Sequence, residues 1–150
     1  MAAGTSKGQI RIFQIERMRG KGGFELNRSS RAENSTELLK YSVGGEISKL
    51  ITFKNQNSNE CFCFVTAEGV LGIQDIRSRA KTMTYNIGKE RGIPRCLAFS
   101  PMGPSLLIGT LDGYVLTYDI RCNLISNIRQ LLVDSNPTSV MGIYESPHFS

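Results

Sequence analysis

Three segments of this chain share one pattern of small, polar and apolar residues, and this repetition limits the fold more than any other feature. The segments are Gly4 to Ile15 (GTSKGQIRIFQI), Val65 to Arg77 (VTAEGVLGIQDIR) and Gly109 to Arg121 (GTLDGYVLTYDIR). When they are aligned, Gly8, Gly69 and Gly113 coincide. In each segment a strand ends in small residues, the chain turns through a polar residue and a glycine that can adopt positive φ, and a second strand follows. Each segment therefore predicts a β-hairpin.

The spacing of the three glycines indicates the kind of repeat. Gly113 lies 44 positions after Gly69, and Gly69 lies 61 positions after Gly8, which is 17 more. A period of about 40–45 residues is typical of the blades of WD-type β-propellers. Residues 17–35 can account for the surplus, because they are rich in Arg, Gly, Ser and Asn and show no hydrophobic period. We predict that they form a basic surface loop inserted between two strands.

The other predicted strands keep the same order in each repeat. First strands are predicted at Ile47 to Phe53, Ile93 to Phe99 and Ser139 to Tyr144, second strands at Cys61 to Val65 and Ser105 to Gly109, and outer strands at Glu37 to Val43, Lys81 to Ile87 and Asn123 to Arg129. The fold class predicted is therefore all-β, a partial WD-repeat β-propeller holding about three blades of a larger ring, with residues 1–150 forming part of one propeller. Because a repeat array buries its core only between neighbouring units, we expect this slice alone to be poorly soluble or self-associating.

The inserted loop gives a first testable prediction. Residues 19–35 contain several basic residues and few groups that could be buried, so trypsin is expected to cut there first under native conditions. Limited proteolysis followed by mass spectrometry of the fragments measures the order of cleavage. Early cleavage after Arg77 or Arg121 would instead mean that the repeated hairpins are not packed.

The residues that could carry chemistry do not form a recognisable catalytic or metal site. Cys61 and Cys63 share one face of a predicted strand, Cys96 and Cys122 fall in other strands or turns, and we expect all four to be buried, reduced thiols. The one histidine, His148, lies near the end of the chain, so neither a zinc site nor a nucleophilic triad is predicted. No cofactor signature is present either, and we expect a segment with no catalytic, cofactor-binding or metal residues.

The basic charge of the chain is concentrated in its first part. The net charge is +5, and residues 1–45 carry eight Lys or Arg against four Glu, whereas the remaining residues carry ten against nine. The possible anion contacts in the inserted loop are Arg17, Arg19, Lys21, Arg28 and Arg31. They can be solvated charges or can bind RNA or an anionic membrane surface, but no aromatic residues alternate with them as a base-stacking surface requires. No apolar run of about 18 residues predicts a transmembrane segment, and no signal-like apolar segment follows the N-terminus.

The hairpin at Gly109 to Arg121 resembles the WD repeat. Its turn holds Asp112 and Gly113, and Tyr118 stands where the usual Trp is found, followed by Asp119. Phe13 with Gln14, and Gln74 with Asp75, occupy the same paired positions in the other copies. The Gly-His dipeptide of the family is missing, so the hydrogen-bond network that family members build between this His and the turn Asp is not expected at Asp112.

A narrower resemblance covers nearly the whole chain. The strings KYSVGGEISKLITF, TAEGVLGIQDIRS, GIPRCLAFSPMGPSLLIGTLDGYVLTYDIRCNLI and PTSVMGIYESP are similar to the C-terminal WD-repeat region of the regulatory, protein-kinase-like subunit of class III phosphatidylinositol 3-kinase. This resemblance implies a non-catalytic scaffold that binds the lipid kinase and a coiled-coil subunit and acts in autophagy and in endosomal or vacuolar sorting. It also implies a cytoplasmic protein that reaches endosomal or autophagic membranes through its complex. The N-terminal serine/threonine kinase-like domain of that family is not part of this chain.

Two other classes of function stay open at this point. A WD-repeat adaptor of an unrelated complex would use the same hairpins, since a fold does not determine a function. An RNA or membrane-surface binder would use the basic inserted loop and would bind in a salt-sensitive way. An enzyme is the reading that the residues support least.

Overall fold

The computed structural model describes residues 2–4, 7–15, 35–55, 59–77, 83–100 and 103–144, and within them the chain is all-β without a helix. The strands are β1 (Ala2–Gly4), β2 (Gln9–Ile15), β3 (Ser35–Ser42), β4 (Ile47–Lys54), β5 (Glu60–Thr66), β6 (Val70–Asp75), β7 (Met83–Asn86), β8 (Pro94–Phe99), β9 (Ser105–Thr110), β10 (Tyr114–Asp119), β11 (Leu124–Gln130), β12 (Leu132–Val133) and β13 (Asn136–Pro137). No helix in this described part is long and apolar enough to span a lipid bilayer.

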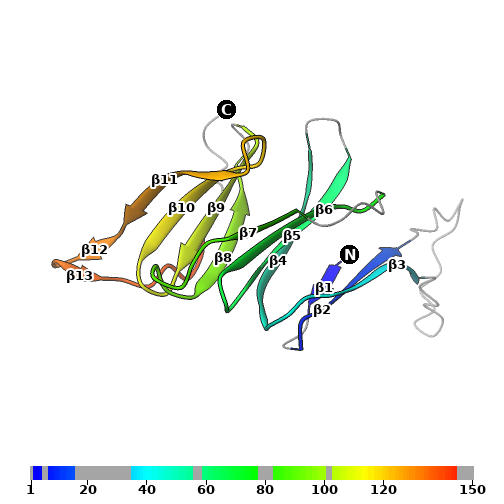
Figure 1. The fold of residues 1–150 in the computed structure, drawn as a ribbon, viewed down its shortest axis with the longest axis horizontal. Helices are drawn as coiled ribbons and strands as arrows, with labels where there is room; N and C mark the ends of the chain where they lie inside the picture. Colours follow the sequence, from blue (N-terminus) through cyan, green and yellow to red (C-terminus); the bar gives the residue numbers. More distant parts are fainter. Residues whose placement is uncertain are drawn as a thin grey trace, which may run out of the picture.

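The strands form antiparallel sheets in which each strand pairs with the next one along the chain (Figure 1). One four-stranded sheet contains β4, β5, β6 and β7, and a second contains β8, β9, β10 and β11. The strands β1, β2 and β3 form a three-stranded sheet, and β12 pairs with β13 in a separate hairpin. Because neighbours in each sheet are also neighbours in sequence, hairpin connections suffice to build all of them.

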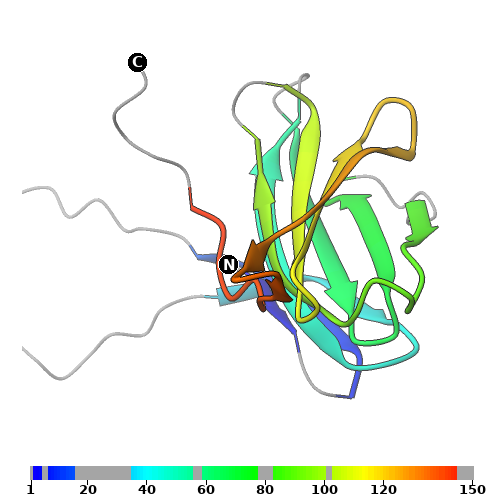
Figure 2. The ribbon, with the colours of Figure 1, turned by 90° about the vertical axis from the view of Figure 1, so that its left-hand side faces the viewer.

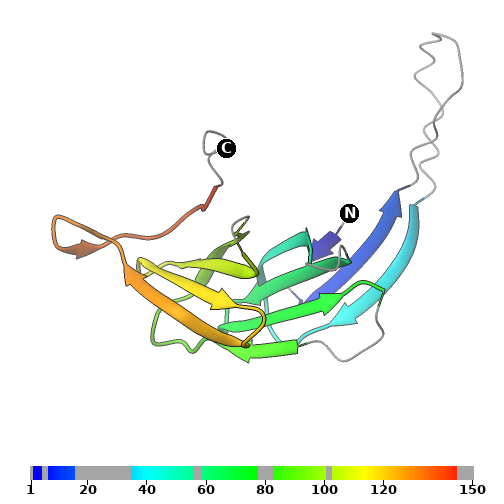
Figure 3. The ribbon, with the colours of Figure 1, turned by 90° about the horizontal axis from the view of Figure 1, so that it is seen from above.

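The three larger sheets follow one another along the long axis of the molecule (Figure 3). The middle sheet is buried on both faces, as β5 shows: six consecutive residues from Cys61 to Thr66 are buried. Successive strand residues point to opposite faces. Phe62 and Phe64 accordingly pack with Ile10 and Ile12 of β2 in one core cluster.

The other face of the middle sheet packs against the sheet of β8 to β11. This second core cluster contains Cys63, Val65, Leu71, Ile73, Ile87, Leu97, Leu106, Ile108, Leu116 and Tyr118. Two aromatic contacts join the sheets across their width: the rings of Phe53 and Phe99 stack with centroids 4.7 Å apart, and those of Tyr85 and Tyr118 lie 5.2 Å apart. Burial on both faces explains why the strand sequences show continuous apolar runs and not a clean alternation.

Most predicted strands are present, with ends shifted by one or two residues, but two predictions need correction and one hairpin was missed. Ser35, which was assigned to the inserted loop, begins β3. Ser139 to Tyr144 is not a strand: Val140 donates one backbone hydrogen bond to the Thr110 carbonyl, but no neighbouring strand pairs with this segment in the described residues. The β12–β13 hairpin was not predicted. The rest of the inserted loop lies outside the described residues.

Candidate functional site

The repeated turns are built alike in the two four-stranded sheets. At Thr66–Gly69 and Thr110–Gly113, the glycine N–H donates to the threonine carbonyl at 3.0 and 3.3 Å. The hydroxyl oxygens of Thr66 and Thr110 accept the N–H of Val70 and Tyr114 at 3.2 and 3.1 Å. Both threonines are fully buried. The only positive φ in each turn is at the glycine, which is the pattern of a type I turn followed by a left-handed residue.

The three aligned glycines also receive the same contact from the chain that leaves each sheet. Gly8, Gly69 and Gly113 have φ of 71°, 83° and 80°. Their carbonyls accept the N–H groups of Val43, Ile87 and Leu131 at 2.8, 2.8 and 2.7 Å, respectively. Backbone atoms thus lie directly against each glycine, and a Cβ at Gly113 would come 2.7 Å from the Thr138 carbonyl oxygen. Glycine is required here for its backbone freedom and for its lack of a side chain.

The sequence separations of these hydrogen bonds locate the insertion independently of the glycine spacing. Gly69 and Ile87 are 18 positions apart, as are Gly113 and Leu131, whereas Gly8 and Val43 are 35 apart. The excess is again 17, and it falls between β2 and β3. The three units therefore share one connection, and the first unit alone lengthens it.

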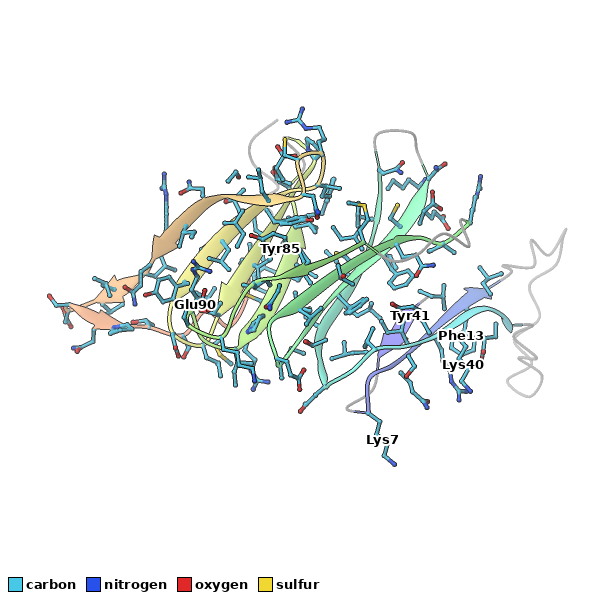
Figure 4. All side chains as sticks on the ribbon, viewed as in Figure 1. Lys7, Phe13, Lys40, Tyr41, Tyr85 and Glu90 are labelled. Atoms are coloured by element: carbon cyan, nitrogen blue, oxygen red, sulfur yellow. The ribbon has the colours of Figure 1, made fainter. Side chains whose placement is uncertain are left out.

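The acidic residues of the turns lie over a second pair of glycines. The Asp112 side chain occupies the space beside Gly92 (φ 82°), and the Glu68 side chain occupies the space beside Gly45 (φ 103°). The Asp112 carbonyl also accepts a hydrogen bond from Gln130 Nε2 at 3.4 Å. Lys7 and Glu90 project from turns at this same end of the sheets (Figure 4). The turn carboxylates thus contact the segments that connect one sheet to the next.

Asp75 and Asp119, the acidic residues of the WD-like pattern, lie at the opposite end of the hairpins, where β6 and β10 end. Oδ1 of Asp75 and Oδ1 of Asp119 accept the backbone N–H of Arg77 and Arg121 at 2.9 and 2.8 Å. Asp119 Oδ2 also pairs with the Arg121 guanidinium at 3.0 Å, and the hydrogen bonds from Arg121 lower the pKa of the Asp119 carboxyl. These two carboxylates hold turns in two different sheets, so they do not form a catalytic pair.

Tyr118 occupies the signature position beside Asp119 and is 1% exposed. Its ring packs against Tyr85 of β7, and its hydroxyl is hydrogen-bonded to Asn123 Oδ1. Burial raises the pKa of Tyr118, with smaller contributions from Tyr85 and Asp119. Phe13, its counterpart in the first repeat, is half-buried on β2. A buried aromatic with a satisfied hydroxyl stabilises the sheet contact and offers no exposed reactive group.

The cysteines are free, and three of them are buried as expected: Cys61, Cys63 and Cys96. Cys122 is exposed, which corrects the expectation for that residue. It lies in the turn after β10, where its backbone N–H donates a hydrogen bond to Asp119 Oδ1 at 3.4 Å. This turn is at the surface, so the thiol does not enter an apolar core. Among the described residues, no group of three His, Cys, Asp or Glu side chains is placed to hold a metal ion.

This difference in burial predicts different thiol reactivities. At pH 7 a maleimide is expected to modify Cys122 rapidly and the three buried thiols only after unfolding, because burial restricts access and raises the pKa of Cys63, Cys61 and Cys96. Peptide mass spectrometry after timed labelling measures this order. The Cys63 thiol ionises near pH 8.5 in the unfolded chain, whereas burial keeps it protonated in the folded protein. The free energy of unfolding is therefore expected to decline as the pH rises above about 8.5. Labelling of Cys63 at the rate of Cys122 would contradict the packing of β5.

The structure brings the described turn residues of the repeats together, such as Thr66 with Gly69 and Thr110 with Gly113. Arg17, Arg19, Lys21, Arg28 and Arg31 lie outside the described residues. The threonines of the turns were not singled out from the sequence, although the shared T-x-x-G spacing at Thr66 and Thr110 could have identified them.

Neither a protein-family model nor a curated protein matches this chain. The described residues present repeated structural turns and exposed connecting segments.

Proposed function

We propose that this chain is part of a WD-type β-propeller and acts as a non-catalytic protein-binding scaffold. The observation that carries the proposal is the threefold backbone hydrogen bond from Val43, Ile87 and Leu131 to the turn glycines, because it repeats one sheet unit at a blade-like period. The face-to-face packing of two four-stranded meanders supports it further, since propellers stack such sheets around an axis. Under this proposal residues 1–150 belong to one propeller, and residues 17–34 are an insertion in its first unit, because Ser35 already belongs to β3.

The proposal extends to a particular family through the resemblance of the strings around Gly109 and Ser139. It assigns the chain to the regulatory subunit of the class III phosphatidylinositol 3-kinase complex, where it binds the lipid kinase and the coiled-coil subunit during autophagy and endosomal or vacuolar sorting. In this role the rigid sheets position exposed connecting segments for protein contacts. Membrane association then comes through the complex.

Affinity purification tests the family assignment. A tagged full-length parent protein is expected to copurify with the class III lipid kinase and the coiled-coil subunit, and mass spectrometry identifies both. A tagged, unrelated propeller protein expressed at the same level serves as the control. Recovery of a different stable complex, with neither of the two subunits, would overturn the family assignment and would favour an adaptor of another assembly.

The basic loop provides the test of the remaining alternative. A variant in which Arg17, Arg19, Lys21, Arg28 and Arg31 are replaced by serine is compared with the wild type for binding to single-stranded RNA and to anionic lipid vesicles. The scaffold proposal expects no binding that is both salt-sensitive and lost in the variant. Such binding, if measured, would identify the loop as an anion-binding site.

A further inference from the structure

The outer end of the second four-stranded sheet carries an unusual concentration of exposed apolar side chains. The stretch Leu124 to Val133 comprises β11, Leu131 and β12, and nine of its ten residues are exposed. Ten large apolar side chains are exposed in the described residues, and five belong to this stretch: Leu124, Ile128, Leu131, Leu132 and Val133. We refer to Leu124 to Val133 as the β11–β12 edge.

The backbone of this edge is available for pairing. Among the described residues, β11 is the terminal strand of its sheet and pairs only with β10, and β12 pairs only with β13. Figure 2 shows β11 and the β12–β13 hairpin in front of the sheets, with no other strand covering them. A terminal strand leaves one row of N–H and C=O groups unpaired, and such a row can pair with an extended chain.

The usual protection of a sheet edge is limited here. Natural proteins shield edge strands with proline, charged side chains, bulges or very short strands. The β11–β12 edge contains no Pro, Gly or Lys and its main strand has seven residues, so its protection consists of Arg129 and one register irregularity between β10 and β11 at Ser126. The other outer strands differ. β7 has only four residues, and β3 carries the charged and exposed side chains Glu37 and Lys40.

The charge of the edge indicates which kind of segment it would accept. Arg129 is its only charged residue and is exposed, and no carboxylate of the described residues forms a salt bridge with it. Arg121, shortly before the edge, is already paired with Asp119. No Asp or Glu occurs between residues 120 and 133, and Asp134 follows the edge. An extended segment with apolar residues and a carboxylate near Arg129 would complement both the apolar side chains and the charge.

We propose that the β11–β12 edge is a docking site to which an extended, apolar and acidic segment of a partner protein adds as a further strand. Main-chain hydrogen bonds to β11 hold the segment, apolar side chains cover the exposed apolar residues of the edge from Leu124 to Val133, and a carboxylate pairs with Arg129. The proposal goes beyond the scaffold function because it names the contact surface and the chemistry of its partner, and it is independent of the family assignment.

A defined peptide tests this docking site. The probe is a fluorescein-labelled, N-acetylated octapeptide of alternating Val and Glu, titrated into the full-length protein and followed by fluorescence anisotropy. Saturable binding is expected, together with slower amide hydrogen exchange at residues 124–133 and unchanged exchange at β3. Arg129→Glu is expected to weaken binding about 3–10-fold, the range of an exposed ion pair turned into a repulsion. A peptide with Lys in place of Glu is expected to bind more weakly by a similar factor.

Two leucines of equal exposure provide a matched control. Leu124 lies in the edge and Leu38 lies in β3, and each is 46% exposed. Leu124→Lys is expected to abolish most of the binding, whereas Leu38→Lys leaves it unchanged, with equal melting temperatures showing that both variants fold. Equal binding by the two variants, or equal protection of β3 and β11, would overturn the proposal. A dimer that forms without peptide and dissociates in Leu124→Lys would also overturn it, because the occupant would then be a second copy of the chain. These measurements involve no lipid kinase, so their failure leaves the family proposal standing.

Discussion

Replacing Phe64 by alanine is expected to lower the free energy of unfolding by about 3–5 kcal/mol, the range for truncating a fully buried aromatic side chain. Phe64 is 0% exposed and packs with Ile10, Ile12 and Phe62 between the first and the middle sheet. Its ring also fills the space above Gly72, where an added Cβ would overlap it. The loss in free energy has two parts: the transfer free energy of the ring atoms that are removed, and the cost of a cavity that the two sheets cannot close.

Chemical denaturation of the full-length protein, followed by amide hydrogen exchange at β5, measures this loss. Leu38→Ala is the control, because this side chain on the outer strand β3 is 46% exposed, and its truncation is expected to change stability by no more than about 0.5 kcal/mol. Similar small effects from both substitutions would mean that the first and the middle sheet do not pack as described.

Replacing Gly113 by valine is expected to lower the free energy of unfolding by about 1–3 kcal/mol through backbone strain. Contact of the added side chain with neighbouring backbone atoms adds to this loss. Gly113 has φ of 80°. A Cβ there would approach the carbonyl oxygens of Thr138 and Leu131 at 2.7 and 2.9 Å. Valine is β-branched and is a poor residue for positive φ. The substitution therefore disturbs the turn and the hydrogen bond from Leu131 together.

Gly103 provides the matched control for this substitution. It lies in the preceding turn of the same sheet, its φ is not positive, and an added Cβ would have no heavy atom within 4 Å. Gly103→Val is expected to leave the melting temperature nearly unchanged, and Gly69→Val is expected to behave like Gly113→Val because both glycines have positive φ. Equal melting temperatures for the variants at Gly103 and Gly113 would contradict the repeated turn.

The prediction of strands and turns succeeded where the evidence was local. The T-x-x-G spacing and the apolar runs specify hairpins, because a glycine that takes positive φ and a strand that follows it depend on neighbouring residues. The β12–β13 hairpin was missed for a related reason: its turn uses Asp134 and Ser135, both at positive φ, and this pair lacks the Asn-Gly or Asp-Gly signal of a tight hairpin.

Exposure and pairing were harder to predict, because they depend on residues far away in the sequence. Cys122 resembles the other cysteines in the sequence, but the turn around Asp119 holds it at the surface. Ser139 to Tyr144 resembles a first strand, but a strand also needs a neighbour with unpaired backbone groups. The concentration of exposed apolar residues on β11 and β12 became visible only when the sheets were in place.

By itself the sequence of this protein determined an all-β chain of repeated hairpins, the glycines of their turns and the position of a long insertion between β2 and β3. Those features follow from backbone conformation and from spacing along the chain. Only the tertiary structure decided that Phe62 and Phe64 face the first sheet while Cys63 and Val65 face the last. Alternation along a strand separates its two faces, but the packing of the sheets determines what covers each face and which edge stays open.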